Sequence, residues 1–217
     1  MITNVLLDLD GTLTDPALGI TNCIIYALTR LDVVAPPAHD LHFAIGPPLR
    51  GTFATLLNCD DAAIIEQAMG FYRERFADTG LFENVVYDGV PEMLATLKAQ
   101  KHRLLLATAK PHVYARRILA HFGILAPFEG IYGSEFDGVR QHKGELLAYL
   151  FTCEGIAPQS TVMVGDRHHD IAAAHANGCR AIGVTYGYGS AAELAHADRL
   201  CDSPARIGTT IAALDAL

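Results

Sequence analysis

The sequence lacks the cysteine pairs by which disulfide-bonded and zinc-binding proteins are recognised. Its cysteines are odd in number, scattered, and contain no CxxC pair: Cys23, Cys59, Cys153, Cys179 and Cys201. Neither a disulfide framework nor a zinc site is predicted from such spacing. We expect reduced thiols in a core, as is usual for isolated cysteines of an intracellular protein.

Long apolar runs and clusters of basic residues are also missing. No segment approaches the roughly 20 apolar residues that a membrane span needs, and residues 1–11 have no basic region of the kind found in signal peptides. The net charge of −8, with only 16 Lys and Arg, argues against a nucleic-acid partner, which binds mainly through basic clusters. We therefore expect a cytoplasmic protein that contacts neither a membrane nor nucleic acid.

What the sequence does contain is an alternation of short apolar runs with segments of helical period. This pattern is typical of βαβ units around a mostly parallel sheet, and 217 residues are enough for such a domain with a smaller insertion. The clearest buried strands are predicted at 4–10, 103–109, 161–166 and 180–187. Helices are predicted to begin at Pro91 and Pro111, and to end at Gly123, Gly155 and Gly178.

The stretch between the first strand and Pro91 has a different character. Residues 15–81 have a helical pattern throughout, and four prolines divide them into short pieces. We predict an all-α module at 15–81, inserted into an α/β core domain formed by 1–14 and 82–217. Two aromatic residues of this module are candidates for stacking on a base, but a helical module needs such residues for its own core, which is where we expect Phe43 and Phe53.

Polar residues gather where the predicted strands end. Asp8 and Asp10 follow the first strand, Thr108 ends the second, Asp166 ends the third with Asp170 one helical turn on, and Lys143 opens a helix. Taken singly, each is ordinarily a turn former, a helix cap or a solvated side chain. Together they meet at the carboxyl edge of one sheet, where ligands of parallel sheets gather.

The chemistry of this set points to phosphoryl transfer. Carboxylates brought together raise one another's pKa values unless a cation is present. Mg²⁺ relieves this conflict, because it binds one or two carboxylates and leaves positions open for phosphate and water. The ammonium group of Lys143 and the hydroxyl group of Thr108 then serve the remaining phosphate oxygens.

The segments DLDGTLTD, TAK, a lone Lys and GDRHHD, in this order and these strand contexts, resemble the four signature motifs of the haloacid dehalogenase superfamily. The resemblance covers nearly the whole chain, since this family inserts its helical C1 cap after the first strand. It implies an α/β fold with a Rossmann-like parallel sheet, helices on both of its faces, and an all-α cap. Within the superfamily the chain is most similar to phosphoglycolate phosphatases and related small phosphomonoester or nucleotide phosphatases.

Carried over by position, the resemblance implies that Asp8 is the nucleophile and forms an aspartyl-phosphate. Asp10 would protonate the leaving alcohol and later deprotonate the attacking water. A carboxylate at that position favours phosphate esters, because family members that cleave carbon–halogen or carbon–phosphorus bonds lack it. Thr108 and Lys143 would hold the phosphoryl group.

The resemblance further implies a Mg²⁺ site. Asp166 would bind the ion together with Asp8 and the backbone carbonyl of Asp10, and Asp170 would orient either a metal-bound water or Lys143. Histidines 168 and 169 flank this set, but adjacent side chains point in different directions and oxygen-rich sites favour magnesium. We therefore expect no histidine ligand, and leave open that His168 contacts the substrate.

Further residues are assigned around the phosphate. Gly11 fits the tight turn after the aspartates, where a missing Cβ lets backbone N–H groups approach the phosphate. At Ala109 close relatives often have Asn, so that phosphate contact there must use the backbone alone. Lys110 is a second candidate ligand, but its place beyond the strand end favours a peripheral position. Arg50, which follows two stiffening prolines, is predicted to contact the leaving-group side of the substrate, with a solvated surface arginine as the alternative.

The function predicted is therefore Mg²⁺-dependent hydrolysis of a small phosphorylated metabolite, as in phosphoglycolate phosphatases, with a 5′-nucleotidase as the alternative. A sugar phosphomutase of the same fold is less favoured, because the cap-side histidine of β-phosphoglucomutases is replaced here by Ile20. A phospho-accepting receiver domain explains neither the helical insertion nor the segment GDRHHD. A catalytically silent protein is disfavoured because every expected catalytic position is filled. The family contains both monomers and homodimers.

Overall fold

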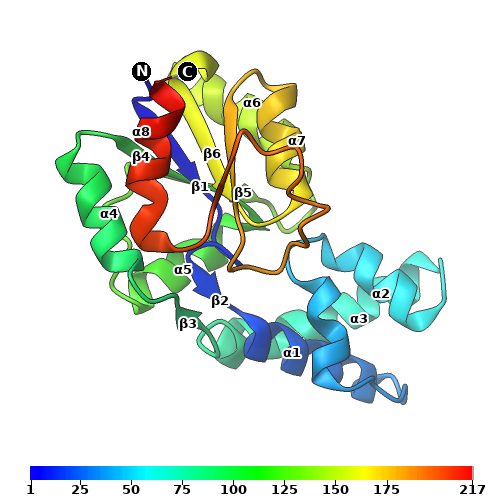
Figure 1. Cartoon of the computed structure of the whole chain (residues 1–217). Coiled ribbons are helices and arrows are strands. Elements are labelled where there is room, and N and C mark those ends of the chain that lie inside the picture. The colour runs from blue at the N-terminus through cyan, green and yellow to red at the C-terminus, as the bar shows by residue number, and fades with distance from the viewer. Residues whose placement is uncertain (217) are drawn as a thin grey trace. The chain divides into compact units, whose positions relative to one another are not determined.

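The computed structural model describes residues 1–216 and divides the chain into two compact units. The first unit comprises Met1–Thr14 and the chain from Val86 onward, and the second unit is Asp15–Val85 (Figure 1). Two short strands, β2 (Thr14–Asp15) and β3 (Val85–Val86), pair where the chain passes between the units.

The first unit is built on a six-stranded sheet in the order β5-β4-β1-β6-β7-β8, in which every neighbouring pair is parallel. Its strands are β1 (Asn4–Leu7), β4 (Arg103–Pro111), β5 (Gly130–Ser134), β6 (Thr161–Gly165), β7 (Arg180–Val184) and β8 (Arg199–Cys201). Its helices are α4 (Val90–Ala99), α5 (His112–His121), α6 (Lys143–Glu154), α7 (His168–Ala176) and α8 (Ile207–Asp215). Helices α6 and α7 lie on one face, with α4 and α8 on the other (Figure 1). The predicted fold class, a parallel sheet with helices on both faces, is confirmed.

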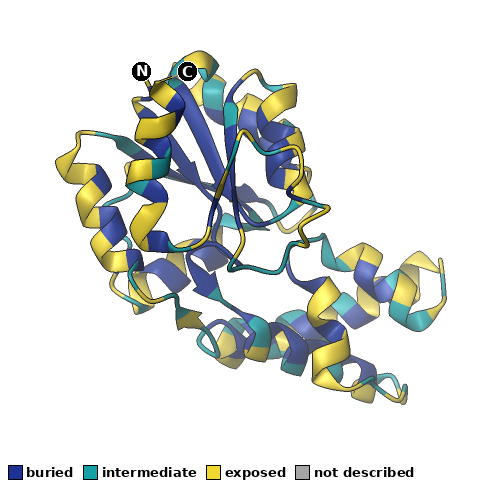
Figure 2. Cartoon of the chain, viewed as in Figure 1, coloured by how far each residue is buried: buried dark blue, intermediate teal, exposed yellow. Residues whose placement is uncertain are grey.

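Burial on both faces explains why the central strands are continuous apolar runs. Every residue of β1 is buried, and the middle strands of the sheet are buried throughout in Figure 2. On the face under α6 and α7, Leu6 of β1 packs in one cluster with Leu105 of β4, Met163 of β6 and Leu147 of α6, all fully buried. This core holds the strands in register, and with them the residues at their carboxyl ends.

Helix ends in the first unit follow the predicted signals. Gly155 ends α6 in the left-handed conformation with φ 61°, and Gly123 and Gly178 follow α5 and α7 with φ 72° and 75°. Pro91 stands in the first turn of α4. The edge strands β5 and β8 and the helix α8 were not predicted.

The second unit is helical. It contains α1 (Ala17–Arg30), α2 (Leu49–Leu57) and α3 (Ala62–Arg75), with a 3₁₀ segment at Ala38–Ala44 and a π turn at Phe76–Gly80. The side chain of Asp61 caps α3 by accepting a hydrogen bond from the Ala63 N–H at 2.8 Å.

The two aromatic residues expected in the core of this unit differ in burial. Phe53 is fully buried and packs edge-on against Tyr72. Phe43 is 46% exposed, so the expectation was wrong for this residue. Side chains three apart align on a 3₁₀ segment, and here Leu41 and Ala44 occupy the buried face, which leaves Phe43 outside it.

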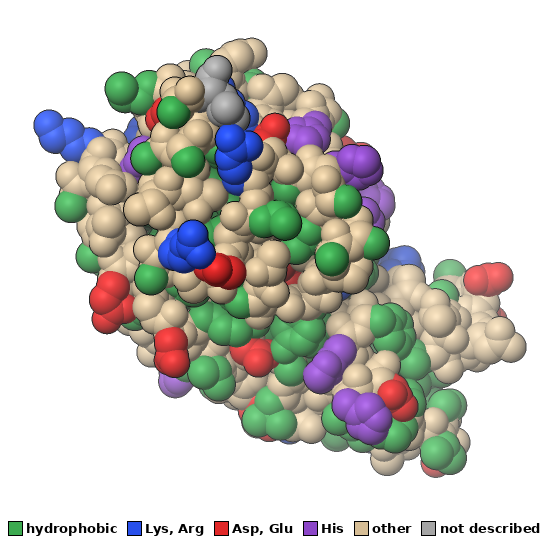
Figure 3. All heavy atoms as spheres, viewed as in Figure 1, with side chains coloured by type: hydrophobic (Ala, Val, Ile, Leu, Met, Phe, Trp, Pro, Cys, Tyr) green, Lys and Arg blue, Asp and Glu red, His purple; other side chains and the backbone are tan. Residues whose placement is uncertain are grey.

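The surface agrees with the low basic content of the sequence. Among the described residues on the face in Figure 3, Lys and Arg side chains stand apart from one another and form no basic patch. In residues 1–216, the helices are all too short or too polar to cross a membrane.

Candidate active site

Strand register brings three of the predicted site residues to one edge of the sheet. Leu7 of β1 pairs with Leu106 of β4 on one side and with Val164 of β6 on the other. Asp8 is the next residue along the chain. It therefore lies close to the level at which β4 reaches Thr108 and β6 leads into Asp166. Because the strands are parallel, their carboxyl ends meet at this edge.

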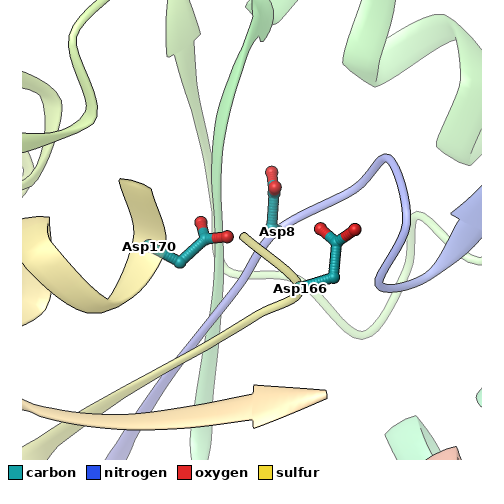
Figure 4. A group of neighbouring side chains, drawn as sticks. All are labelled: Asp8, Asp166 and Asp170. Carbon is teal, nitrogen blue, oxygen red and sulfur yellow. The ribbon is translucent and has the colours of Figure 1, made fainter. Parts of the chain in front are cut away.

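A cluster of carboxylates forms there. Oxygen atoms of Asp8, Asp166 and Asp170 lie within 4.8 Å of one another, and all three residues are buried. Figure 4 shows the three side chains converging from the end of β1, the turn after β6 and the start of α7. Three acidic groups in so small a buried volume repel one another unless positive charge balances them.

Burial and mutual repulsion raise pKa values within this cluster. The pKa of Asp166 rises to about 8, first because of burial and then because of the neighbouring Asp170 and Asp8. The pKa of Asp170 rises to about 6, again chiefly through burial, although Lys143 opposes the rise. The pKa of Asp10 is also raised, because burial outweighs the effect of Lys110. In each case burial is the largest cause of the raised pKa, and the nearby positive charge does not offset it.

Lys143, the first residue of α6, supplies part of that charge. Its side chain is only 5% exposed, and its Nζ lies 2.9 Å from Oδ2 of Asp8. The same ammonium group donates a hydrogen bond to Oδ1 of Asp170. Burial lowers the pKa of Lys143, but Asp170 and Asp8 more than reverse this and hold the group charged.

Some carboxylate oxygens of the site accept hydrogen bonds, and others do not. Asp170 Oδ2 accepts the Arg167 N–H at 3.0 Å, so both of its oxygens are hydrogen-bonded. Asp166 Oδ2 accepts the Tyr188 N–H at 2.8 Å. In contrast, Oδ1 of Asp8 and Oδ1 of Asp166 are buried and have no hydrogen-bond partner among the described residues. A buried oxygen pair without donors is costly alone and suits a hard cation such as Mg²⁺.

The turn after Asp10 needs glycine for space as well as for conformation. Gly11 has φ +79°, and a Cβ added there would lie 2.2 Å from Oδ2 of Asp166. The next residue is fixed by Tyr186, whose hydroxyl donates to the Thr12 carbonyl at 3.0 Å. The backbone of this turn therefore packs directly on the carboxylate cluster.

Strand β4 places the TAK segment beside this turn. Thr108 is 2% exposed, and its Oγ1 accepts the Lys110 N–H at 3.3 Å. The Ala109 carbonyl accepts the Ser134 hydroxyl at 2.8 Å, which ties this segment to β5.

Lys110 does not lie at the periphery. Its side chain is 7% exposed, and its Nζ lies 2.7 Å from Oδ2 and 2.8 Å from Oδ1 of Asp10. The expectation of a peripheral position was wrong because it ended the strand at residue 109, whereas β4 continues to Pro111. Lys110 thus belongs to the strand end and reaches the turn that carries Asp10.

Two predicted residues have partners of their own. Arg50 stands in the first turn of α2, half exposed, and forms an ion pair with Glu66 of α3 within the second unit. His168 bonds through Nδ1 to Glu193 Oε1 at 2.9 Å. Burial, followed by the neighbouring His168, lowers the pKa of His169 to about 4, so that its imidazole is held neutral. Neither histidine belongs to the carboxylate cluster of Figure 4.

Sequence reasoning missed the loop after β7. Besides Tyr186 and the Tyr188 N–H, this loop contributes Gly189, where an added Cβ would lie 1.8 Å from the Asp166 carbonyl oxygen. The only signal was the run TYGYGS, in which Gly187 ends a predicted strand and Gly189 follows it. Such glycines indicate a close backbone approach, and the approach here is to Asp166.

Comparisons with known proteins identify the family to which the chain is similar. The family described as haloacid dehalogenase-like hydrolase matches residues 5–184. A 5′-nucleotidase of Pseudomonas aeruginosa is 49% identical over 191 residues, covering 88% of this chain and 86% of the relative. A phosphoglycolate phosphatase of Chromobacterium violaceum is 30% identical over 200 residues, covering 89% of each chain. The crystal structure of a predicted phosphatase from Clostridium acetobutylicum superimposes with a TM-score of 0.93 at 38% identity, covering 98% of this chain and 100% of that one.

Proposed function

The chain belongs to the haloacid dehalogenase-like hydrolase family and is a phosphoric monoester hydrolase, and we propose that it cleaves small phosphate monoesters through an aspartyl-phosphate on Asp8 with Mg²⁺ as cofactor. The family predicted from the sequence motifs is thereby confirmed. One observation carries the mechanism proposed: Asp8 has one carboxylate oxygen on Lys143 and a second that is buried without a hydrogen-bond partner among the described residues.

In the first half of the reaction, a carboxylate oxygen of Asp8 attacks phosphorus. A bond forms between this oxygen and phosphorus, and the bond from phosphorus to the ester oxygen breaks. The carboxyl group of Asp10 donates its proton to the departing ester oxygen, which leaves as an alcohol. Lys143, already 2.9 Å from Asp8, balances the charge on the transferring group.

In the second half, water attacks the same phosphorus atom. Asp10, now a carboxylate, accepts a proton from this water while the bond between phosphorus and the Asp8 oxygen breaks. Inorganic phosphate leaves, and both aspartates return to their starting states. The Thr108 hydroxyl group, buried at the end of β4, is proposed to hydrogen-bond the phosphoryl oxygens in both halves.

The metal ion has a fitting donor set. Oδ1 of Asp8 and Oδ1 of Asp166 would hold it, together with the backbone carbonyl of Asp10. When bound, Mg²⁺ supplies positive charge that polarises the phosphoryl oxygens and offsets the carboxylates of the site. Asp170 has both oxygens occupied by Lys143 and the Arg167 N–H, so we assign it to orienting Lys143.

For the substrate class, we propose nucleoside 5′-monophosphates before phosphoglycolate. The 49% identity to the Pseudomonas 5′-nucleotidase extends over 88% of this chain and supports the first. The lower identity to the phosphoglycolate phosphatase, 30%, supports the second. Arg50 stays a predicted recognition residue, and an anionic substrate group would have to compete there with Glu66.

The test is phosphate release from a panel of nucleoside 5′-monophosphates, phosphoglycolate and sugar phosphates, with Mg²⁺ and with a chelator. We expect turnover that needs Mg²⁺, is fastest for the nucleotides, and falls at least about 1000-fold in Asp8→Asn because the nucleophile is lost.

Asp202→Asn is the matched control, because it makes the same chemical change at an exposed aspartate of the first unit. It should retain full activity. A folded wild-type protein that releases no phosphate from any ester, or an Asp8→Asn variant as active as wild type, would contradict the proposal. A preference for phosphoglycolate would overturn only the substrate class.

A further inference from the structure

The edge of the sheet holds two buried lysines that serve different carboxylates. Lys143 contacts Asp8 and Asp170, which belong to the cluster. Lys110 contacts Asp10, with its Nζ at 2.7 and 2.8 Å from the two oxygens. The side chains of Lys110 and Asp10 are 7% and 10% exposed, so this ion pair is nearly closed to water.

A buried ion pair of this geometry restricts the carboxyl group strongly. Because both oxygens lie almost equally far from one Nζ atom, the ammonium group faces the whole carboxyl group and fixes the direction in which the Asp10 side chain points. Lys110 is itself fixed, since it lies in β4 and its N–H bonds to Thr108 Oγ1. The strand end therefore determines where the Asp10 oxygens lie.

Proton transfer is sensitive to such placement. An acid or base must lie within hydrogen-bond reach of the atom that gains or loses the proton, and misplacement by about 1 Å can cost on the order of 100-fold in rate. Asp10 must meet this condition twice in the proposed reaction, at the ester oxygen and at the attacking water. Lys110 also offsets the Coulombic repulsion between Asp10 and the neighbouring carboxylate of Asp8.

We propose that Lys110 is a positioning residue that holds the Asp10 carboxyl group for both proton transfers. Lys110 keeps its own protons throughout; the protons move only between Asp10, the ester oxygen and the attacking water. The inference rests on the role proposed above for Asp10. It assigns to Lys110 a task different from that of Lys143, although both are buried lysines at one sheet edge.

The experiment compares the kinetics of Lys110→Met, Asp10→Asn and the double variant with two substrates. Adenosine 5′-monophosphate has an alkoxide leaving group that needs a proton, whereas p-nitrophenyl phosphate releases a stable phenolate without one. We expect Lys110→Met to lower kcat for the nucleotide by about 10- to 100-fold with KM nearly unchanged. With p-nitrophenyl phosphate, the initial burst of nitrophenolate should keep its wild-type rate, and only the later turnover should slow.

The double variant shows whether Lys110 acts through Asp10. In the Asp10→Asn background, Lys110→Met should change the turnover of p-nitrophenyl phosphate by less than about two-fold, because the group it positions no longer transfers protons. Lys98→Met, which removes an exposed ammonium group paired with Glu129, is the control and should behave as wild type.

Three results would overturn the inference. A rise in KM at constant kcat would mean that Lys110 binds the substrate, and a full loss of rate in the Asp10→Asn background would mean that it acts on the phosphoryl group directly. If the rate of the nitrophenolate burst fell as much as kcat for the nucleotide, a role confined to proton transfer would be excluded. If Lys110→Met fails to fold because Asp10 is left as a buried charge, Lys110→Arg takes its place in the same comparison. Failure of the proposed function is separately visible, since the wild-type protein would then release no phosphate.

Discussion

At the scale of single residues, the site depends on space as much as on charge. Glycine is required at position 11 for two reasons. Its φ of +79° favours glycine, and an added Cβ would overlap the Asp166 carboxylate. Gly123 has a similar φ of +72°, but nothing lies within 4 Å of the Cβ it would carry. The pair separates the cost of backbone conformation from the cost of displacing a functional side chain.

We therefore predict different outcomes for Gly11→Ala and Gly123→Ala. Both should lose about 1–3 kcal/mol of unfolding free energy from the left-handed backbone. Only Gly11→Ala should also lose activity, by at least about 10-fold, because Asp166 must move away from its place beside Asp8. Urea unfolding and steady-state kinetics of the two variants check this, and equal activities in both would contradict it.

The predictability of the residues differs for a physical reason. Asp8, Asp10 and Asp166 could be nominated because acidic side chains at the ends of buried strands stand out in an apolar sequence. Lys143, which opens a helix, could be nominated because it matches the lone Lys of the family's motifs. The place of Lys110 could not, since it depends on how far β4 continues, and strand ends are poorly marked in sequence when a strand leaves its regular register before a proline. The register between β4 and β5 indeed shifts between Ala107 and Pro111.

At the scale of elements, the loop after β7 is joined to the start of α7 by one carboxylate. Glu193 accepts hydrogen bonds from the Ser190 N–H at 3.0 Å, from Arg167 Nε at 3.1 Å and from His168 Nδ1 at 2.9 Å. Arg167 also donates its N–H to Asp170, so this link stabilises the segment between Asp166 and Asp170. Although burial acts in the opposite direction, these bonds lower the pKa of Glu193 to about 2.

This lowered pKa predicts a pH dependence of stability. Since the folded state binds the Glu193 proton less tightly than the unfolded state, whose pKa is near 4.5, the contribution is complete above that pH and is lost as the pH falls toward 2. Glu193→Gln should be less stable than wild type near neutral pH, by at most about 3 kcal/mol. The difference should shrink steadily below about pH 4.5.

Urea unfolding of both proteins from neutral to acidic pH measures this difference. Glu145→Gln, at an exposed position of α6, is the control for a general effect of removing a negative charge. A stability difference that stays constant down to about pH 3 would show that Glu193 does not act as an ionised acceptor.

Elements were predictable where local signals and tertiary structure agree. The strands β1, β6 and β7 are apolar runs because both of their faces are buried, and the glycines after α5, α6 and α7 mark real helix ends. Strand β5 has the sequence GIYGS, whose two glycines weaken any strand signal, and β8 has only three residues. Both are edge strands that form because a neighbouring strand offers its hydrogen-bonding groups, which a local pattern does not record.

At the scale of the whole molecule, the net negative charge leaves the binding of an anionic substrate to a few local positive groups. The chain carries a net charge of −8, yet two buried ammonium groups, of Lys110 and Lys143, stand at the carboxyl edge of the sheet. A net negative field does not attract an anionic substrate from a distance. Binding of a phosphate ester must therefore depend on local cations, namely Lys143 and the Mg²⁺ proposed here.

The residues assigned to the proposed chemistry and the residue predicted to recognise the substrate fall in different units. The first unit contains every residue assigned to the proposed chemistry, and its sheet positions them through strand register. The second unit contains Arg50, the one residue predicted to recognise the leaving group. Catalytic chemistry was accordingly easier to infer from sequence than substrate choice, because motifs mark strand ends but do not describe the shape of a pocket.

The most direct test of the account is to trap the phosphoryl group on the protein. We would mix the Mg²⁺-loaded protein with p-nitrophenyl phosphate, quench with acid during the first turnover, and locate the phosphoryl group by peptide mass spectrometry. The account predicts an acid-stable, hydroxylamine-sensitive phosphoryl group on Asp8, absent when Asp8→Asn is treated identically. Turnover without any phosphorylated protein, or with the phosphoryl group on another residue, would contradict it.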